Sequence, residues 1–195
     1  MKIFLFILLL TLCSAANSQL HYETKDSCFN ALDSLNKKTG LWMESYSSTS
    51  YAINCYTNGL LNGTCYEYAF NILSEKTNYV LGIKNGVYIS FNIDGFPLEI
   101  SNYKNGKLSG IRYYFYENHS IRTIIYFEND LYNEIFEAYN PNGTISVRQE
   151  YTNGELNGHQ ILFWPNGNIK TISNYLNGNL QGEIKHFEEN GNLIK

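Results

Sequence analysis

Four histidines and one pair of adjacent acids are the side chains of this sequence best suited to metal binding or acid–base catalysis. Metal sites need several such ligands held together, and general acid–base catalysis needs paired carboxylates. His21, His119, His159 and His186 are scattered, and Glu188-Glu189 lies in a turn-rich stretch. Nucleophile-elbow, P-loop and HExxH patterns are absent. We therefore predict no catalytic residue, no metal site and no cofactor, and expect a non-enzymatic protein.

The cysteines could form a disulfide if the protein is exported. Cys55 and Cys65 flank one turn motif, so a hairpin could bring them together, but the sequence does not show whether they face each other. Cys28 would then be free or paired with a partner. The cysteine spacings match no zinc motif.

Residues 1–18 have the features of a secretory signal peptide. Lys2 precedes an apolar run from Ile3 to Leu12, and small residues follow, with cleavage expected after Ser18 or Ala16. The apolar run is too short to cross a bilayer core of about 30 Å. We predict a periplasmic, cell-envelope or secreted protein. The alternative is a lipoprotein lipidated at Cys13, although Leu12 is bulkier than lipoprotein signals prefer.

Aromatic side chains are the feature of the sequence that most suggests a binding function, since the chain holds 17 Tyr, 11 Phe and 2 Trp. Exposed aromatic rings suit protein interfaces and stacking on sugars. The alternative is that the rings pack only against one another. If they bind, the candidate surface comprises Trp42, Tyr114, Tyr116 and Trp164. The net charge of −4 argues against nucleic acid and anionic lipid as partners.

These residues are embedded in a repeat whose clearest sign is an octet such as YTNGELNG (151–158). Its final glycine recurs in steps of 23 or 24 residues, so units start near 40, 63, 86, 110, 134, 158 and 182, with Glu134 replacing the glycine once. We call this position the marker. A second turn motif follows the marker by eight residues. It reads Asn142-Gly143 and Asn166-Gly167 in two units.

Both turn motifs predict hairpins, because Asn and Gly adopt positive φ readily. The runs between them are six to nine residues long and rich in Tyr, Phe, Ile and Thr, which is typical of strands. We predict an all-β, elongated antiparallel meander over 39–195. Asn129-Asp130, Glu134 and residues 70–78 depart from the pattern, so bends or bulges are expected there. The predicted turn residues are Gly63, Gly86, Gly110, Asn142, Gly143, Asn153, Gly154, Gly158, Asn166, Gly167 and Gly182.

Residues 19–38 do not follow the repeat and are predicted to cap it. Cys28, Ala31, Leu32 and Leu35 could form the apolar face of a short helix. The alternative is an irregular lead-in that covers the open edge of the first strand.

The repeat resembles the MORN-repeat variant (MORN_2-like) common in exported bacterial proteins, which are often named YwqK-family antitoxins. The clearest cores are 103–119, 151–167 and 175–191, and the opening NKKTGLWMESY (36–46) is also similar. The resemblance implies a twisted sheet with aromatic ladders. A 24-residue period allows equivalent rings to stack through the intervening strand.

The functional hypothesis is a scaffold that binds another protein or self-associates. One alternative is a module that binds the cell envelope or a glycan. Another is an antitoxin or immunity-type protein that binds a toxin, which the resemblance implies.

Overall fold

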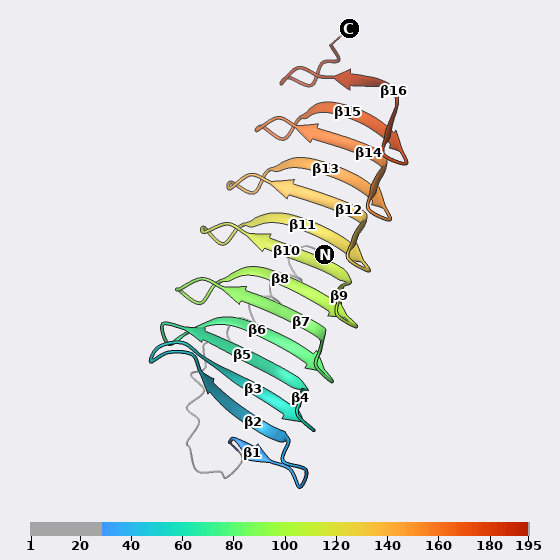
Figure 1. Cartoon of the computed structure of the whole chain (residues 1–195). Coiled ribbons are helices and arrows are strands. Elements are labelled where there is room, and N and C mark those ends of the chain that lie inside the picture. Colours follow the sequence, from blue (N-terminus) through green and yellow to red (C-terminus); the bar gives the residue numbers. More distant parts are fainter. Residues whose placement is uncertain (1–28, 195) are drawn as a thin grey trace, which may run out of the picture. The chain divides into compact units, whose positions relative to one another are not determined.

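Strands joined by tight turns make up the part of the chain that the structure describes, residues 29–194 (Figure 1). The computed structural model divides these residues into two units, one comprising 29–84 with 88–97, and the other 85–87 with 98–194. Within residues 29–194 no helix is long and apolar enough to cross a membrane. The predicted signal peptide, Cys13 and Cys28 lie outside the described residues.

The first unit is an antiparallel meander. Its strands are β1 (Ala31–Leu32), β2 (Lys38–Ser45), β3 (Tyr51–Thr57), β4 (Leu60–Leu61), β5 (Gly63–Ala69), β6 (Ile72–Val80) and most of β7 (Ile83–Phe91), whose residues 85–87 belong to the second unit. They lie in the order β1-β2-β3-β5-β6-β7, with β4 paired to β3. Each strand pairs with its neighbour in sequence because only short turns separate them.

The second unit repeats this plan. Its strands are β8 (Pro97–Lys104), β9 (Lys107–Leu108), β10 (Gly110–Phe115), β11 (Ile121–Glu128), β12 (Leu131–Tyr139), β13 (Ile145–Thr152), β14 (Glu155–Phe163), β15 (Ile169–Leu176) and β16 (Asn179–His186). The order is β8-β10-β11-β12-β13-β14-β15-β16, with β9 paired to β8. The predicted all-β antiparallel meander is confirmed within each unit.

The turn inside the octet has the predicted backbone geometry. Asn153 and Gly154 have φ of 51° and 87°, and the flanking Thr152 and Glu155 pair directly. Two consecutive positive φ values define a type I′ turn, whose twist matches that of the strands. Asn129-Asp130 keeps the same geometry, with φ of 52° and 70°, so this departure preserves the tight turn.

The second turn motif works differently from the prediction. Gly143 has φ 84°, but Asn142 does not have positive φ. Instead the Asn142 side-chain oxygen accepts a hydrogen bond from the Thr144 amide at 3.1 Å, while the Gly143 amide donates to the Asn140 carbonyl at 2.8 Å. Asn166 accepts from the Asn168 amide in the same way, at 2.9 Å. At this turn asparagine therefore acts through its side chain, and only the glycine needs the left-handed region.

Residues 70–78, which lack the second turn motif, still form a hairpin. Phe70 and Asn71 make a two-residue turn with φ of 54° and 62°, and Ala69 pairs with Ile72. The register shifts between Glu67 and Tyr68, so the expected bulge lies in β5 just before the turn. The Phe70 ring is 78% exposed.

The seventh residue of the octet ties one repeat to the next. The Asn157 side-chain oxygen accepts from the Asn177 amide at 3.4 Å, and its nitrogen donates to Thr152 Oγ1 at 3.2 Å. The Gly178 amide also donates to the Leu156 carbonyl, at 2.8 Å. Equivalent side-chain bonds join Asn62 to Leu81 and Asn133 to Asn153. These three octet turns are therefore fastened to the octets before them.

The marker position requires a left-handed backbone. Gly158 has φ 123°, and a Cβ there would lie 2.1 Å from a Glu150 carboxylate oxygen. Gly63, Gly86, Gly110 and Gly182 also have positive φ. Glu134 takes φ 59° at the same position, which is strained for a residue with a side chain.

The segment that precedes the repeat forms a strand where a helix was one expectation. Ala31 and Leu32 pair with Thr39 and Lys38 of β2. The helical face that would include Leu35 is therefore wrong over the described residues. The alternative, a lead-in covering the edge of the first repeat strand, agrees with β1, because its backbone satisfies β2 groups that would otherwise be open.

Little of the described chain is fully buried, since each unit is a single layer of strands (Figure 1). The buried apolar residues are Ala52, Cys65, Ile125 and Phe127. An aromatic ladder contributes to the packing of the second unit. Tyr132 meets Phe127 at 5.0 Å and Tyr151 at 5.3 Å between ring centroids, both edge-on. Phe127 and Tyr151 open consecutive octets, so equivalent rings are joined through the intervening strand, as predicted.

Candidate functional site

Trp42, the first of the predicted binding residues, is held within the first unit. Its indole N–H donates to the Ala31 and Thr39 carbonyls at 3.1 and 3.2 Å. The Lys38 ammonium lies 4.7 Å from the ring centroid, and the Tyr56 ring meets it edge-on. The half-buried indole thus links β1 to β2.

Tyr116 and Trp164 each fasten one hairpin to the next. The Tyr116 hydroxyl donates to the Tyr139 carbonyl at 2.8 Å, and the Trp164 indole N–H donates to the Phe187 carbonyl at 3.0 Å. Donor and acceptor are 23 residues apart in both cases, so the two rings do the same structural work in different repeats. Their polar edges are committed to the sheet.

Tyr114 lies beneath two guanidinium groups. The Arg112 and Arg122 guanidinium carbons are 4.7 and 5.1 Å from its ring centroid. The three predicted residues of the second unit do not form one patch, because Tyr116 and Trp164 stand two repeats apart. The assignment of these residues to a binding surface therefore stays a prediction.

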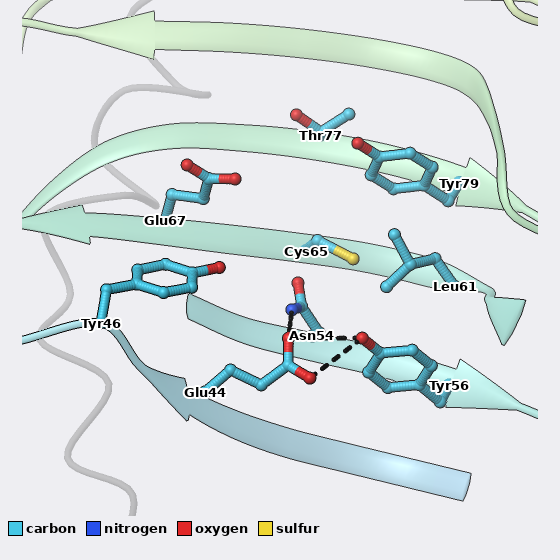
Figure 2. Close-up of a pocket in the computed structure, with 9 residues that line it drawn as sticks. All are labelled: Glu44, Tyr46, Asn54, Tyr56, Leu61, Cys65, Glu67, Thr77 and Tyr79. Atoms are coloured by element: carbon cyan, nitrogen blue, oxygen red, sulfur yellow. Dashed lines mark hydrogen bonds between the residues drawn. The ribbon is translucent and has the colours of Figure 1, made fainter. Parts of the chain in front are cut away.

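A pocket of ≈ 240 Å³ opens in the first unit instead (Figure 2). Its lining residues come from four of the strands and the end of β2: Glu44, Tyr46, Asn54, Tyr56, Leu61, Cys65, Glu67, Thr77 and Tyr79. Ordinary ligand pockets hold about 300–1,000 Å³, so this one suits a single side chain or a group of similar size.

Small side chains form the floor of the pocket. Asn54, Cys65 and Thr77 are 8%, 5% and 7% exposed, and Cys65 lies directly opposite Thr77 in the β5–β6 register. Larger side chains, including Tyr56 and Tyr79, surround them (Figure 2). The Thr77 side chain lines the pocket and forms no hydrogen bond with residues 29–194. A pocket-lining hydroxyl in that state is available to hydrogen-bond a polar occupant.

Glu44, on one side of the pocket, is fully engaged. It accepts hydrogen bonds from Lys38, from the Asn54 amide at 2.7 Å and from the Tyr56 hydroxyl at 3.2 Å. The Lys38 hydrogen bond is the main cause that lowers the pKa of Glu44, and the same bond raises the pKa of Lys38. This carboxylate is anionic, and its charge is balanced by the lysine.

Glu67, on the other side, has no such balance. Its carboxylate makes no hydrogen bond or ion pair with residues 29–194, and Glu67 stands directly opposite Glu75 in the β5–β6 register. Like charges in that arrangement disfavour the pairing. Burial and then the charge of Glu67 raise the pKa of Tyr46, so that phenol stays protonated. The pocket therefore has an excess negative charge.

The disulfide between Cys55 and Cys65 is not formed, and both are free thiols. Asn54 and Tyr56, on either side of Cys55, both line the pocket together with Cys65. Because side chains alternate along a strand, Cys55 points to the opposite face from Cys65. Burial raises the pKa of the Cys65 thiol, which disfavours the nucleophilic thiolate.

The pocket has the chemistry of a cation-binding site. It combines uncompensated carboxylate charge, a free hydroxyl and tyrosine rings, all of which attract a positively charged group. Within residues 29–194, no group of three or more His, Cys, Asp and Glu side chains could hold a metal ion. The arrangement favours an organic cation.

Residues 156–177 match a protein-family model described as MORN repeat variant. The segment is similar to that family. The match begins at Leu156, the second residue of β14, and ends at Asn177, just after β15, and it confirms the resemblance predicted from the sequence. No curated protein matches the chain. The turn geometry at Asn153-Gly154 recurs at Asn177-Gly178, where φ is 49° and 75°.

The repeat pattern of the sequence explains why Glu44, Glu67 and Thr77 were not predicted. They occupy strand positions that the repeat does not fix, and none belongs to a turn or to the aromatic column. One signal was available. Cys65 stands two residues after its marker glycine, where the repeat starting at Gly110 carries Arg112.

Proposed function

We propose that this chain is an exported, non-enzymatic MORN-type repeat protein whose open sheets bind another protein or a second copy of the chain. The observation that carries the proposal is the exposure of large apolar side chains. Four apolar residues are buried, whereas 21 large ones are exposed among residues 29–194. Single-layer sheets have no second layer to cover these side chains, and exposed apolar surface on that scale marks interaction sites.

A repeat scaffold also fits the way the fold is stabilised. The octet turns at 81–82, 153–154 and 177–178 are fastened to the preceding octets by Asn side chains and glycine amides, so the chain can present side chains without a closed core. Ile111 and Ile135 illustrate the display. They follow consecutive markers and are 37% and 36% exposed, in β10 and β12. Such positions can be substituted without removing a turn contact.

The test combines sedimentation with affinity capture from envelope extracts. We expect either concentration-dependent self-association or a specific partner, weakened in Ile111→Ser/Ile135→Ser. The matched control is Glu183→Ser, which changes an exposed residue at the same repeat position in β16. A chain that stays monomeric and captures no protein contradicts the proposal. Retention on peptidoglycan or polysaccharide instead would favour the glycan-binding alternative.

Export is tested separately by sequencing the N-terminus of the protein recovered from its host. The basic residue, apolar run and small residues of 1–18 support removal after Ser18 or Ala16. An N-terminus that retains Met1 would contradict export through cleavage. A lipid-modified Cys13 would place the protein on a membrane.

A further inference from the structure

The second unit contains an internal counterpart of the pocket. Cys65 and Arg112 each stand two residues after a marker glycine, and Glu67 and Tyr114 each stand four residues after it. The neighbouring strands also correspond. Asn54 and Ser101 precede their octets by two residues, as do Thr77 and Ile125. The two places are therefore equivalent in the repeat.

In the second unit this place is filled by an arginine of the chain itself. The Arg112 guanidinium lies 3.0 Å from a Glu99 carboxylate oxygen. Its carbon is 4.7 Å from the Tyr114 ring centroid and 5.9 Å from that of Phe127. Both partners of the ion pair are largely buried, with side chains 21% and 14% exposed. The fold thus holds a guanidinium between a carboxylate and aromatic rings at this position.

In the first unit the same place is hollow. Cys65 is much shorter than arginine, and its neighbours Tyr56 and Tyr79 open octets, as Phe127 does. Glu67 brings a carboxylate without a counter-ion, at the repeat position of Tyr114, whereas the position of Glu99 is taken by Ala52. Thr77, a buried residue, brings a hydroxyl that has no hydrogen-bond partner among residues 29–194. Carboxylate, hydroxyl and tyrosine are the groups that a guanidinium recognises.

We propose that the pocket around Cys65 binds a guanidinium group, the arginine side chain of a partner protein. This inference rests on the proposed protein-binding function for the identity of the partner. The chemistry of the pocket can be tested without any partner.

The test is a titration of the isotope-labelled chain with N-acetyl-arginine amide, followed through the backbone amide signals of Cys65, Glu67 and Thr77. We expect saturable shifts confined to these residues and their neighbours. The citrulline analogue has the same shape without the charge and should not bind. The lysine analogue should bind several-fold more weakly, because an ammonium lacks the planar fork of donors.

Two variants make the test specific. Cys65→Arg supplies the group in cis and should abolish the shifts. Glu67→Gln removes one charge from an exposed side chain and should weaken binding about tenfold, whereas the control Glu183→Gln in β16 should leave it unchanged. Glu67→Gln keeps the proposal testable even if Cys65→Arg fails to fold.

Absence of saturable shifts, equal binding of the citrulline analogue, or unchanged binding by Glu67→Gln would overturn the proposal. Equal binding of the lysine analogue would overturn the assignment to guanidinium. A positive titration with no captured protein would instead count against the proposed function alone. A captured partner with a negative titration would count against the guanidinium site alone.

Discussion

The surroundings of Cys65 and of Arg112 show one repeat position used in two ways. In the second unit the arginine fills the space between strands and pairs with Glu99. In the first unit the cysteine leaves a pocket beside Glu67, whose charge is unpaired. The backbone elements are the same, so the difference arises from the side chains. Cys65 stands where the second unit has Arg112, Glu67 where it has Tyr114, and Ala52 where it has Glu99. Repeat proteins can therefore build a site by leaving out a residue that closes the same place elsewhere.

Removing the Arg112 side chain from the second unit should have the largest effect on stability. Arg112→Ala leaves Glu99 buried without its cation and removes a side chain that covers two rings. We expect a loss of about 2–3 kcal/mol in the free energy of unfolding, measured by denaturant titration. Arg148→Ala is the control, because Arg148 lies 3.8 Å from Glu137 and is 44% exposed. It should cost less than about 1 kcal/mol, and equal losses would contradict the comparison.

Neutralising Glu44, the hydrogen-bonded acid of the pocket, should have a smaller effect on the free energy of unfolding. Glu44→Gln weakens the hydrogen bonds from Lys38, Asn54 and Tyr56 and should cost about 1–2 kcal/mol. The folded pKa of Glu44 is lowered, so its contribution is complete above the unfolded value of about 4.3 and is lost as the pH falls through the folded value.

The wild type should therefore lose stability in acid more steeply than Glu44→Gln, as measured by unfolding between pH 6 and the acid limit of folding. Parallel pH profiles for the two chains would show that Glu44 does not hold its partners as described. Glu183→Gln, which changes an exposed acid of β16, should follow the wild type.

A change in backbone strain at the marker position, where Glu134 replaces glycine, should have the smallest effect on stability. Glu134→Gly should stabilise the chain by about 0.5–1 kcal/mol, because glycine adopts φ 59° without strain. The relief of strain exceeds the cost of ordering glycine, which has more conformational entropy in the unfolded state. Glu134→Ala removes the same side chain but keeps the strain, so it should bring no such gain. Thermal unfolding of the two variants measures the difference. Equal midpoints would show that the strain at Glu134 is negligible.

Local features of the fold could be predicted from the sequence. The positive φ values of Asn153-Gly154 and of the marker glycines could be predicted from the residue types, because a tight turn itself requires positive φ. The roles of Asn142 and Asn157 could not be predicted in the same way. The first uses its side chain where positive φ was expected, and the second bonds to the turn of the following repeat. Contacts of that kind depend on the register of strands, which the local sequence does not contain.

The candidate site was harder to predict than the fold. Trp42 and Trp164 were chosen by residue type, but their indole N–H groups are bound to backbone carbonyls of the sheet. The pocket depends on the opposite kind of residue, the small Cys65 and Thr77. The small side chain of Cys65 leaves a pocket only because neighbouring strands place Glu67 and the tyrosines around it. Comparing equivalent repeat positions would have been the way to find it.

The most direct test of the account is to exchange the two residues and repeat the arginine-analogue titration. In the chain carrying Cys65→Arg and Arg112→Cys, the first unit supplies its own guanidinium and the second unit lacks one. The account predicts that the amide shifts disappear around Thr77 and appear around Tyr114 and Ile125. Shifts that stay in the first unit, or that appear in neither, would contradict it.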